Sequence, residues 1–578
     1  MPILVRFMIA ATLISSCSAD FATPQEKVSA PGRYSGYSTQ MYDGWVRSSQ
    51  YVTARDGTRL AVDIFRPAQN GTAVSTPYPV LLSITQYRRA VNGQDGSVRY
   101  SAGSMLELVR YGYVVVVADA RGKGASFGTR RSPWSVEEAR DAFDVIQWTA
   151  GQSWSTRKVG MFGASYLAGI QYAAASMRPP ALKAIVPPVV PFDNYDVYFG
   201  MIPPNGPFYD VGNVDTDLQT LPVDGDNDKA LLKAAVEEHR RNSYPSAMPF
   251  RDSISPTLGV NYYREINPID HMQDIERSGV AIYHMGFWDN WLRKGSILGF
   301  VNLKNPGKLA LLGTERPRQA DGTAFNSQLE HLRWFDYWLK GVENGIAKEP
   351  PVFYSTVNTP GGGRFSATWP LTGERRTNYY LGEGTLETNP ASANGAKDTR
   401  VVEYEMSLDT RAEKGFVYAG APLSTPLEVA GHPSVELWAS CTATDGDFIV
   451  YLQDVSPDGS VLDVTDGRIR ASNRALHQPT FNNLGLPWSR SYKEDALPLK
   501  PDEAVRMRFE MLPTSWLFQA GHRMRVLVTN SIPTKSFGID LFNSTPRVTP
   551  APTVTIVRDR EHASLITLPV IAPGAGND

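Results

Sequence analysis

The hydrophobic and polar positions of this chain change their pattern near residue 350. Before that point, short apolar runs alternate with stretches whose apolar residues recur at helical spacing. Residues 113–118 form a β-branched run that fits a buried parallel strand, and 133–149 has an acidic start, helical spacing and an end before Gly151. Alternation of this kind predicts a mostly parallel sheet covered on both faces.

Further elements follow from the same patterns. A turn at Asp56-Gly57 within an alternating stretch predicts a β-hairpin over 51–67. From about 191 to 275 the alternation gives way to Pro-rich loops, which indicates a helical cap inserted over the sheet. The remaining predicted elements are strands at 79–85, 184–190, 279–285 and 308–313, and helices at 104–111, 229–241 and 328–340.

Beyond residue 351 the chain consists of short alternating segments separated by Gly, Pro, Asn and Asp. Residues 435–439, 448–452 and 523–528 are examples, and the pattern is typical of an all-β sandwich. The predicted domains are an α/β part in two pieces (51–190 and 278–345), a cap between them (191–277) and a C-terminal sandwich (351–573).

Length and charge narrow the range of functions. A chain of 578 residues is too long for one core, which agrees with two or three domains. The formal net charge is −2 and no long Lys or Arg run is present. We therefore expect neither nucleic acid nor an anionic membrane surface as a partner.

The first residues resemble an export signal. Arg6 precedes an apolar run, 7–14, that is too short to span a bilayer as a mature helix. Small residues lead into Cys17, as in bacterial lipoprotein signals, where such a cysteine is lipidated. We predict a signal at 1–17, a tether and lead-in at 18–50, and a periplasmic or outer-membrane-anchored lipoprotein. An ordinary signal peptide cut near Ala19 and an uncleaved N-terminus are the alternatives.

The second cysteine, Cys441, is the only other one in the chain. Once Cys17 is lipidated or removed, no intrachain disulfide and no cysteine-ligated metal site can form.

Ser165 is the main candidate for chemistry. Residues 159–169 predict a strand, a tight turn and the start of a helix, and small residues before the serine permit a strained turn that projects its oxygen. A serine alcohol is a poor nucleophile at neutral pH and needs a base, a group that orients the base, and donors for the oxyanion. Asp289, later in the chain, is a candidate acid. A plain loop serine is the alternative.

Over roughly residues 45–570 the chain resembles the superfamily of cocaine esterases, α-amino-acid ester hydrolases and X-prolyl dipeptidyl-peptidases. Residues 119–128 follow its pattern Asp-x-Arg-Gly-x-Gly-x-Ser-x-Gly, and 163–166 follow its Gly-x-Ser-Tyr, with Ala168 where a later Gly is usual. The other matching segments are 141–148 with Gln152-Ser-Trp154, 286–289, 333–341, 454–459 and 466–470. The resemblance implies an α/β-hydrolase fold with a helical cap insertion and a C-terminal jelly roll of the galactose-binding type.

The resemblance also implies roles for particular residues. Ser165 would be the nucleophile and Asp289 the acid that orients the base. The Tyr87 hydroxyl and the backbone N–H of Tyr166 would donate to the oxyanion. Neither a metal nor another cofactor is implied, and the substrate would be a small-molecule or peptide acyl compound. A structural aromatic at Tyr87 and a solvated acid at Asp289 are the competing interpretations.

The histidine of this site is missing from its motif. The superfamily places it in a Gly-Pro-Trp-x-His loop after the strand predicted at 308–313, and Pro317 stands there instead. One candidate base is His284, unless it is a buried core histidine. Another is His331, unless it packs on its helix. The third is Glu315, whose pKa a second carboxylate nearby would raise. The fourth explanation is that no working triad exists.

The sequence thus predicts an exported serine hydrolase-like protein, an acyl esterase or dipeptidyl-peptidase, that works through an acyl-enzyme on Ser165. The alternatives are a catalytically impaired pseudo-enzyme or ligand-binding protein, and an acyltransferase on the same scaffold. Asp193 and Asp196 in the cap are either solvated loop carboxylates or groups that hold a substrate ammonium.

Overall fold

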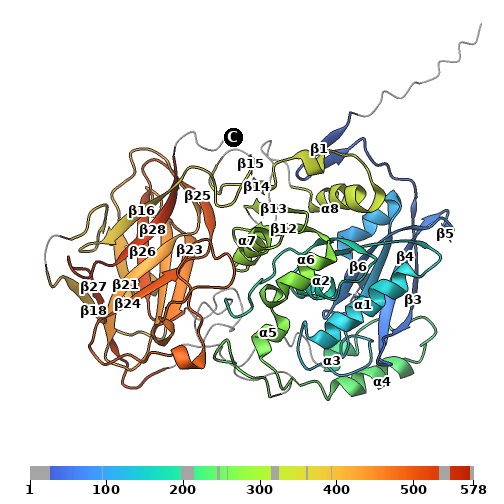
Figure 1. The fold of residues 1–578 in the computed structure, drawn as a ribbon, viewed down its shortest axis with the longest axis horizontal. Coiled ribbons are helices and arrows are strands. Elements are labelled where there is room, and N and C mark those ends of the chain that lie inside the picture. Colours follow the sequence, from blue (N-terminus) through green and yellow to red (C-terminus); the bar gives the residue numbers. More distant parts are fainter. Residues whose placement is uncertain are drawn as a thin grey trace, which may run out of the picture.

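The chain folds into an α/β part and an all-β part, which Figure 1 shows on the right and on the left of the molecule. The computed structural model describes residues 26–93, 95–196, 214–243, 248–256, 258–313, 325–359, 362–391, 394–532 and 547–572. The predicted signal segment with Cys17 lies outside these ranges. Within them, no helix is long and apolar enough to cross a membrane.

The α/β part is built on an 11-stranded sheet, in the order β15-β14-β13-β12-β11-β10-β6-β9-β4-β3, with β5 paired to β4. The strands from β14 to β9 run parallel, and β15, β4 and β3 are antiparallel to their neighbours. The bounds are β3 Gly44–Thr53, β4 Arg59–Gln69, β5 Thr72–Ala73, β6 Tyr78–Thr85, β9 Val114–Asp119, β10 Ser155–Phe162, β11 Leu182–Val186, β12 Ala281–Phe287, β13 Gly307–Leu312, β14 Val352–Tyr354 and β15 Arg364–Ser366.

These strands confirm the predicted parallel sheet, although several strand ends differ from the predicted ones. The hairpin turns at Asp56-Gly57 as predicted, but its first strand, β3, begins at Gly44, inside the predicted lead-in. β11 ends at Val186, before the predicted end at 190. Pro187 and Pro188 follow it, and proline has no N–H to donate to a neighbouring strand.

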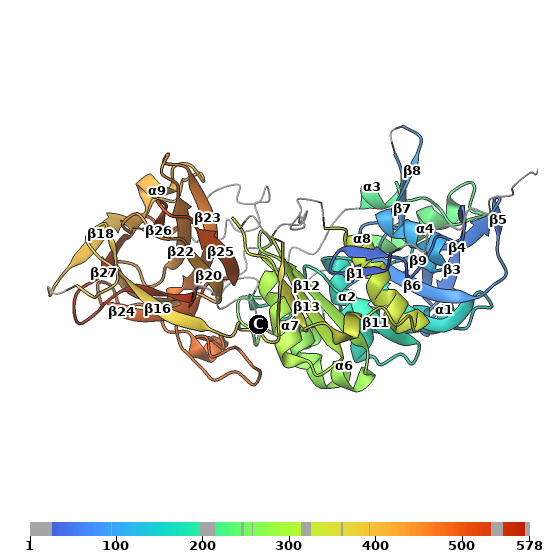
Figure 2. The same cartoon turned by 90° about the horizontal axis from the view of Figure 1, so that it is seen from above.

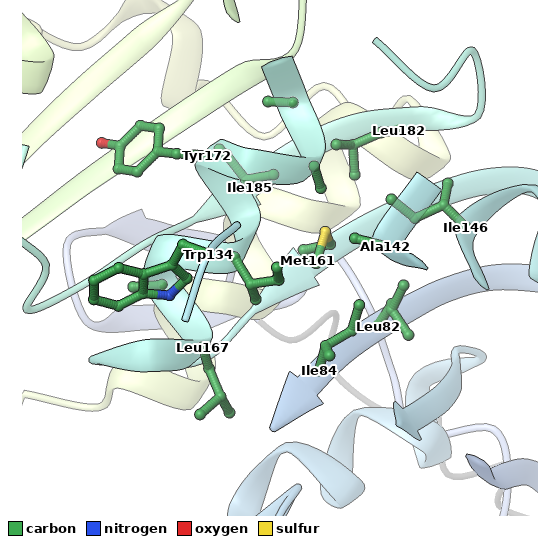
Figure 3. Close-up of a cluster of buried hydrophobic side chains, with 14 of the residues drawn as sticks. Leu82, Ile84, Trp134, Ala142, Ile146, Met161, Leu167, Tyr172, Leu182 and Ile185 are labelled. Carbon is green, nitrogen blue, oxygen red and sulfur yellow. The ribbon is translucent and has the colours of Figure 1, made fainter. Parts of the chain in front are cut away.

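Helices cover both faces of the sheet because its central strands are apolar on both sides. Val114 and Val116 of β9 belong to one buried cluster, and Val115 and Val117 belong to another. The first face carries α1 (Val136–Ala150), α2 (Tyr166–Ser176), α6 (Met272–Ser278) and α7 (Arg293–Asn302). The second carries η1 (Gly103–Tyr111), α8 (Ser327–Phe335) and η4 (Asp336–Lys340). Figure 3 shows Ala142 and Ile146 of α1 packed near Met161 of β10.

The segment between β11 and β12 departs from the strand–helix alternation, as predicted. Its described elements are α3 (Val214–Asp217), α4 (Ala230–His239), α5 (Tyr262–Ile266) and η3 (Pro268–His271). They are followed by α6, which packs against α2 and so belongs to the layer that covers the sheet. Two small hairpins, β1–β2 (Val28–Ala30, Arg33–Ser35) and β7–β8 (Ala90–Asn92, Val98–Tyr100), and the turn η5 (Ile346–Lys348) complete this part.

The all-β part contains a nine-stranded and a four-stranded sheet, which enclose one buried cluster to which both contribute, for example Val435 of β21 and Val450 of β22. The two sheets confirm the predicted sandwich. The larger sheet holds β16 Glu374–Leu381, β17 Leu386–Glu387, β18 Lys397–Val401, β20 Leu427–Gly431, β21 Ser434–Cys441, β24 Val505–Glu510, β25 Thr514–Phe518, β27 Thr553–Val557 and β28 Leu565–Ile571. The smaller holds β19 Phe416–Ala419, β22 Asp447–Val455, β23 Val461–Arg470 and β26 Arg523–Thr529. Three short helices are α9 Arg411–Lys414, η6 Ala471–Asn473 and η7 Lys493–Asp495.

The two parts meet where α7 faces the sandwich, which Figure 2 shows between them. The buried Arg293 side chain donates from Nε to the Pro513 carbonyl at 2.6 Å and from Nη2 to Thr465 Oγ1 at 3.2 Å. Trp291, just before α7, packs against apolar side chains of the four-stranded sheet. The loop that precedes α7 is thereby fixed to the C-terminal part.

Candidate active site

Ser165 lies in a sharp turn between β10 and α2. Its backbone has φ 60° and ψ −122°, values that side-chain-bearing residues rarely adopt. Gly163 has φ 121°, and a Cβ there would lie 2.6 Å from Leu167 Cβ, so only glycine fits at this point of the turn. The Ser165 N–H donates to the Pro188 carbonyl after β11. The turn therefore holds Ser165 exposed at the C-terminal end of β10, as predicted for a nucleophile elbow.

Two donors that the sequence assigned to the oxyanion lie beside this serine. Tyr87 follows β6, the neighbour of β10, and its hydroxyl oxygen is 3.2 Å from Ser165 Oγ. Tyr166 is the first residue of α2, and the first N–H groups of a helix have no acceptor within the helix. The arrangement provides a phenol O–H and a helix N-terminus next to the serine oxygen.

Asp289 lies at the same edge of the sheet. It comes two residues after the end of β12, which is the second strand from β10 in the sheet. The turn there is closed by a hydrogen bond from the Asn290 N–H to the Phe287 carbonyl. The preceding Trp288 is buried and donates from its indole to the Ser355 carbonyl at 2.6 Å. Asp289 itself is exposed. The acid candidate thus lies on an anchored loop at the edge from which Ser165 projects.

His284 is held in the core and not at the serine. It is only 2% exposed, and its Nδ1 lies 2.9 Å from the hydroxyl oxygen of Tyr172 on α2. Its ring also lies against Gly299 of α7, where an added Cβ would be 2.8 Å from Nδ1. Burial lowers the pKa of His284 to about 3. This placement favours the interpretation of a hydrogen-bonded core histidine over that of a general base.

No contact among the described residues brings His331, the second base candidate, to Ser165. His331 lies on α8, on the opposite face of the sheet from α2, and its Nδ1 lies 2.6 Å from the Ser327 carbonyl one turn earlier. Burial lowers its pKa as well. This placement favours helix packing as its role. Glu315 and Pro317 follow β13 in the sequence and lie outside the described residues.

The two predicted cap acids, Asp193 and Asp196, are both paired with cationic side chains of the protein. Asp193 is 2% exposed and ion-paired with Arg251, whose other guanidinium nitrogen contacts Asp196 at 3.3 Å. Asp196 also pairs with Lys294 of α7 at 2.6 Å, and Lys294 pairs with Glu510 of the sandwich. Burial alone lowers the pKa of Lys294, but these two carboxylates raise it above its usual range. Both cap acids are therefore already neutralised by protein cations.

These ion pairs line a pocket between the chain after β11, α7 and the sandwich, with an empty volume of about 820 Å³ that includes open solvent. Its other walls are aromatic, with Tyr195, Trp291, Trp488 and Phe509 among them. In the described part of the chain, no group of three or more His, Cys, Asp or Glu side chains is arranged to hold a metal ion.

The architecture and this site define a class of protein, the CocE/NonD-type hydrolases with a C-terminal all-β domain. The crystal structure of a CocE/NonD family hydrolase from Staphylococcus aureus matches with a TM-score of 0.70 at 22% identity, over 91% of this chain and 94% of that chain. An α-amino acid ester hydrolase matches with a TM-score of 0.61 at 20% identity, over 96% of this chain and 100% of that chain.

Sequence similarity then gives the family. The X-Pro dipeptidyl-peptidase (S15 family) model matches residues 56–315, and the X-Pro dipeptidyl-peptidase C-terminal non-catalytic domain matches 344–565. A Mycobacterium tuberculosis (strain CDC 1551 / Oshkosh) protein, provisionally named a serine esterase, is 30% identical over 94% of this chain and 98% of its own length. The cocaine esterase of Rhodococcus sp. (strain MB1 Bresler) is 28% identical over 84% of this chain and 91% of its own length. The chain belongs to the S15 family of hydrolases.

Proposed function

We propose that this protein is a serine hydrolase that cleaves a carboxylic ester through an acyl-enzyme on Ser165. The geometry at the serine is the observation that carries the proposal. Its oxygen is exposed on a strained turn, and the Tyr87 hydroxyl lies 3.2 Å away. Strain of this kind costs about 1–3 kcal/mol and is typical of functional sites.

In the proposed reaction, Ser165 Oγ attacks the ester carbonyl carbon while its proton passes to a base. The Tyr87 O–H and the Tyr166 N–H donate to the oxyanion that forms. The tetrahedral adduct then expels the alkoxide, which takes up a proton, and leaves an acyl-enzyme. Water attacks this ester in the second half and releases the acid and the free serine. Glu315, which lies outside the described residues, is the base we propose, because His284 and His331 are held in other contacts.

Two arguments favour an ester whose acyl group carries no α-ammonium. The first concerns the acids that would hold the ammonium, and the second concerns the leaving group. Asp193 and Asp196, the acids available to hold an ammonium group, are engaged with Arg251 and Lys294. An amine is also a poorer leaving group than an alkoxide and depends more on a general acid, the role that a triad histidine performs. The names of the similar mycobacterial and Rhodococcus proteins agree with esterase activity.

The test is labelling of the purified protein with a fluorophosphonate between pH 4 and 9, with Ser165→Ala as the control. We expect labelling of the parent that the variant loses. A carboxylate base predicts labelling that persists at acidic pH, whereas a histidine predicts loss below about pH 6.5. A well-folded parent that does not label would reject the proposal in favour of the pseudo-enzyme, and the search would move to ligands.

We further propose that the chain is exported and lipidated on Cys17. The support is the apolar run 7–14 and the small residues before the cysteine. Expression with labelled palmitate, followed by membrane fractionation, tests this. Label in the membrane fraction of the parent but not of Cys17→Ser is expected, and equal labelling of both would contradict it.

A further inference from the structure

The two oxyanion donors belong to distant parts of the chain, and a buried ion pair links them. Tyr87 lies in the loop after β6, and Tyr166 begins α2. Between them lies the pair Arg130–Glu138, with Nε to Oε1 at 2.6 Å and side chains that are 0% and 2% exposed. Both residues lie on the chain that follows β9, Arg130 before α1 and Glu138 in its first turn. Glu138 contacts Tyr166, and Arg130 contacts both the Tyr166 ring and Gln86, the residue before Tyr87.

On the Tyr166 side, Glu138 and Arg130 fix the ring. The phenol donates to Glu138 Oε2 at 2.8 Å, and the Arg130 guanidinium lies 4.8 Å from the ring centroid. Burial, and then the Glu138 charge, raise the pKa of Tyr166 well above its usual value, so the phenol stays protonated and keeps donating. The ring is thus held from its hydroxyl and from one face, and the backbone N–H at its base is held with it.

Trp134 adds a third hold on Tyr166. Its ring stacks on the Tyr166 ring at 5.9 Å, and its indole N–H donates to the Tyr166 carbonyl at 2.9 Å. Its own backbone N–H donates to Glu138 Oε2 at 2.6 Å. Trp134 lies against α2, near Leu167 in Figure 3, because position 169 is Gly: a Cβ there would be 2.3 Å from the indole. Glu138 therefore orders both the tyrosine and the residue stacked on it.

On the Tyr87 side, the contact passes through Gln86. The Gln86 side chain is 2% exposed, and its Oε1 accepts from Arg130 Nη1 at 2.6 Å. The next residue is Tyr87, whose N–H donates to Thr85 Oγ1 at 2.9 Å. The rings of Tyr87 and Tyr166 meet edge to face at 6.5 Å. One guanidinium therefore contacts both the residue next to the first donor and the ring of the second.

We propose that Arg130 and Glu138 are positioning residues that set the separation of the Tyr87 hydroxyl and the Tyr166 N–H at Ser165. An oxyanion hole requires its donors to be fixed before the reaction, and displacements near 1 Å can lower a rate about 10²-fold. A buried, hydrogen-bonded ion pair resists such displacement, since separating its charges in a low dielectric is costly. This inference rests on the proposed function of Ser165.

The test uses two conservative variants that leave the ion pair and the serine in place. Tyr166→Phe keeps the ring, its stacking on Trp134 and the backbone N–H, and removes only the bond to Glu138. Gln86→Met removes the side-chain oxygen that accepts from Arg130. The matched control is Asp141→Asn, which breaks the Arg121–Asp141 pair (Nε to Oδ2, 2.6 Å), another largely buried ion pair, one turn further along α1.

The measurements are kcat and KM on a p-nitrophenyl ester, the affinity of a boronic acid that forms a tetrahedral adduct with serine, and the thermal unfolding curve. We expect Tyr166→Phe and Gln86→Met to lower kcat about 10- to 100-fold with KM within about two-fold. The boronate affinity should fall in parallel with kcat/KM. Asp141→Asn should stay within about two-fold of the parent in all kinetic constants. A purely structural role would instead lower the unfolding temperature and leave the boronate affinity unchanged.

The outcomes separate this inference from the function on which it rests. A parent that hydrolyses and labels on Ser165, with both variants unchanged in kcat and boronate affinity, overturns the positioning role alone. A parent that neither hydrolyses nor labels overturns the proposed function, and the inference with it. Glu138→Gln is the stronger perturbation and is compared only if its unfolding curve matches that of the parent.

Discussion

Substitution of His284 tests directly whether this buried histidine is structural or catalytic. The perturbation is His284→Leu, made alone and together with Tyr172→Phe, with Tyr172→Phe as the third variant. The imidazole and the phenol form one hydrogen bond of 2.9 Å in which both groups are almost fully buried. The three variants and the parent therefore form a double-mutant cycle across a single contact.

The magnitudes follow from burial. His284→Leu leaves the Tyr172 hydroxyl buried without this partner, which costs about 1–3 kcal/mol of the free energy of unfolding. Replacing both partners with apolar groups is nearly neutral, so the double variant should recover most of that loss. Protonating His284 in place at pH 7 is also unfavourable, because burial lowers its pKa to about 3. A base that must take up a proton during the reaction is poorly served by this position.

The position of the partner of His284 on α2 gives the same answer. Its partner Tyr172 lies seven residues beyond Ser165, about 10 Å further along the helix at 1.5 Å per residue. We therefore expect all three variants to label with fluorophosphonate within about two-fold of the parent rate. Urea unfolding supplies the stability cycle, and the slope with urea should stay constant. A 10³-fold or larger fall in labelling for His284→Leu, with its urea midpoint unchanged, would refute the structural assignment.

Two further predictions concern one donor and one buried histidine. Tyr87→Phe removes an oxyanion donor and should lower kcat about 10²- to 10³-fold with little change in KM, measured by ester hydrolysis; an unchanged kcat would remove Tyr87 from the site. His432 in the sandwich accepts a hydrogen bond from the Trp369 indole. Burial, and then the charge of Lys294, lowers the pKa of His432 to about 3. As the pH falls through about 6.5, the unfolded chain therefore binds a proton at this residue that the folded chain does not bind. Its contribution to stability is present above pH 6.5 and lost as the pH falls toward 3. His432→Gln should therefore shift the acid-unfolding midpoint, followed by tryptophan fluorescence, to lower pH, and an identical midpoint would contradict this.

Much of the fold could be predicted because its signals are local. The run at β9, with no exposed residue, and the alternation at β21 appear in the sequence as uninterrupted or alternating apolar positions. Element ends and helix types were less accessible. Residues 328–340 were predicted as one helix, but the structure divides them into α8 and the π-helical η4, and 103–111 is a 3₁₀ helix. These differences depend on packing against the sheet, which periodicity alone does not encode.

The site was predictable in part for the same reason. Ser165 and Tyr87 stand in short motifs beside strands, and the structure brings them together at 3.2 Å. The fate of Asp193 depends on Arg251, far away in the sequence, so no local pattern indicated that this acid is neutralised. The Arg130–Glu138 pair was missed as well. Its spacing of eight residues has no local meaning, since its contacts with Gln86 and Tyr166 exist only in the folded chain.

Because the histidine is missing from its motif, the size of the loss in kcat on mutation decides whether Ser165 acts as a nucleophile. In a working triad, removal of the serine alone costs about as much as removal of all three members, on the order of 10⁶-fold, and what remains is about 10³- to 10⁴-fold catalysis from the oxyanion hole and binding. If Glu315 serves as a base, Ser165→Ala should therefore lower kcat by several orders of magnitude. If no base operates, the serine adds little, and Ser165→Ala should differ from the parent by less than about ten-fold, while Tyr87→Phe still lowers the residual rate. The ratio of these two losses thus measures whether the strained turn at Ser165 supports nucleophilic attack or only a preorganised pocket.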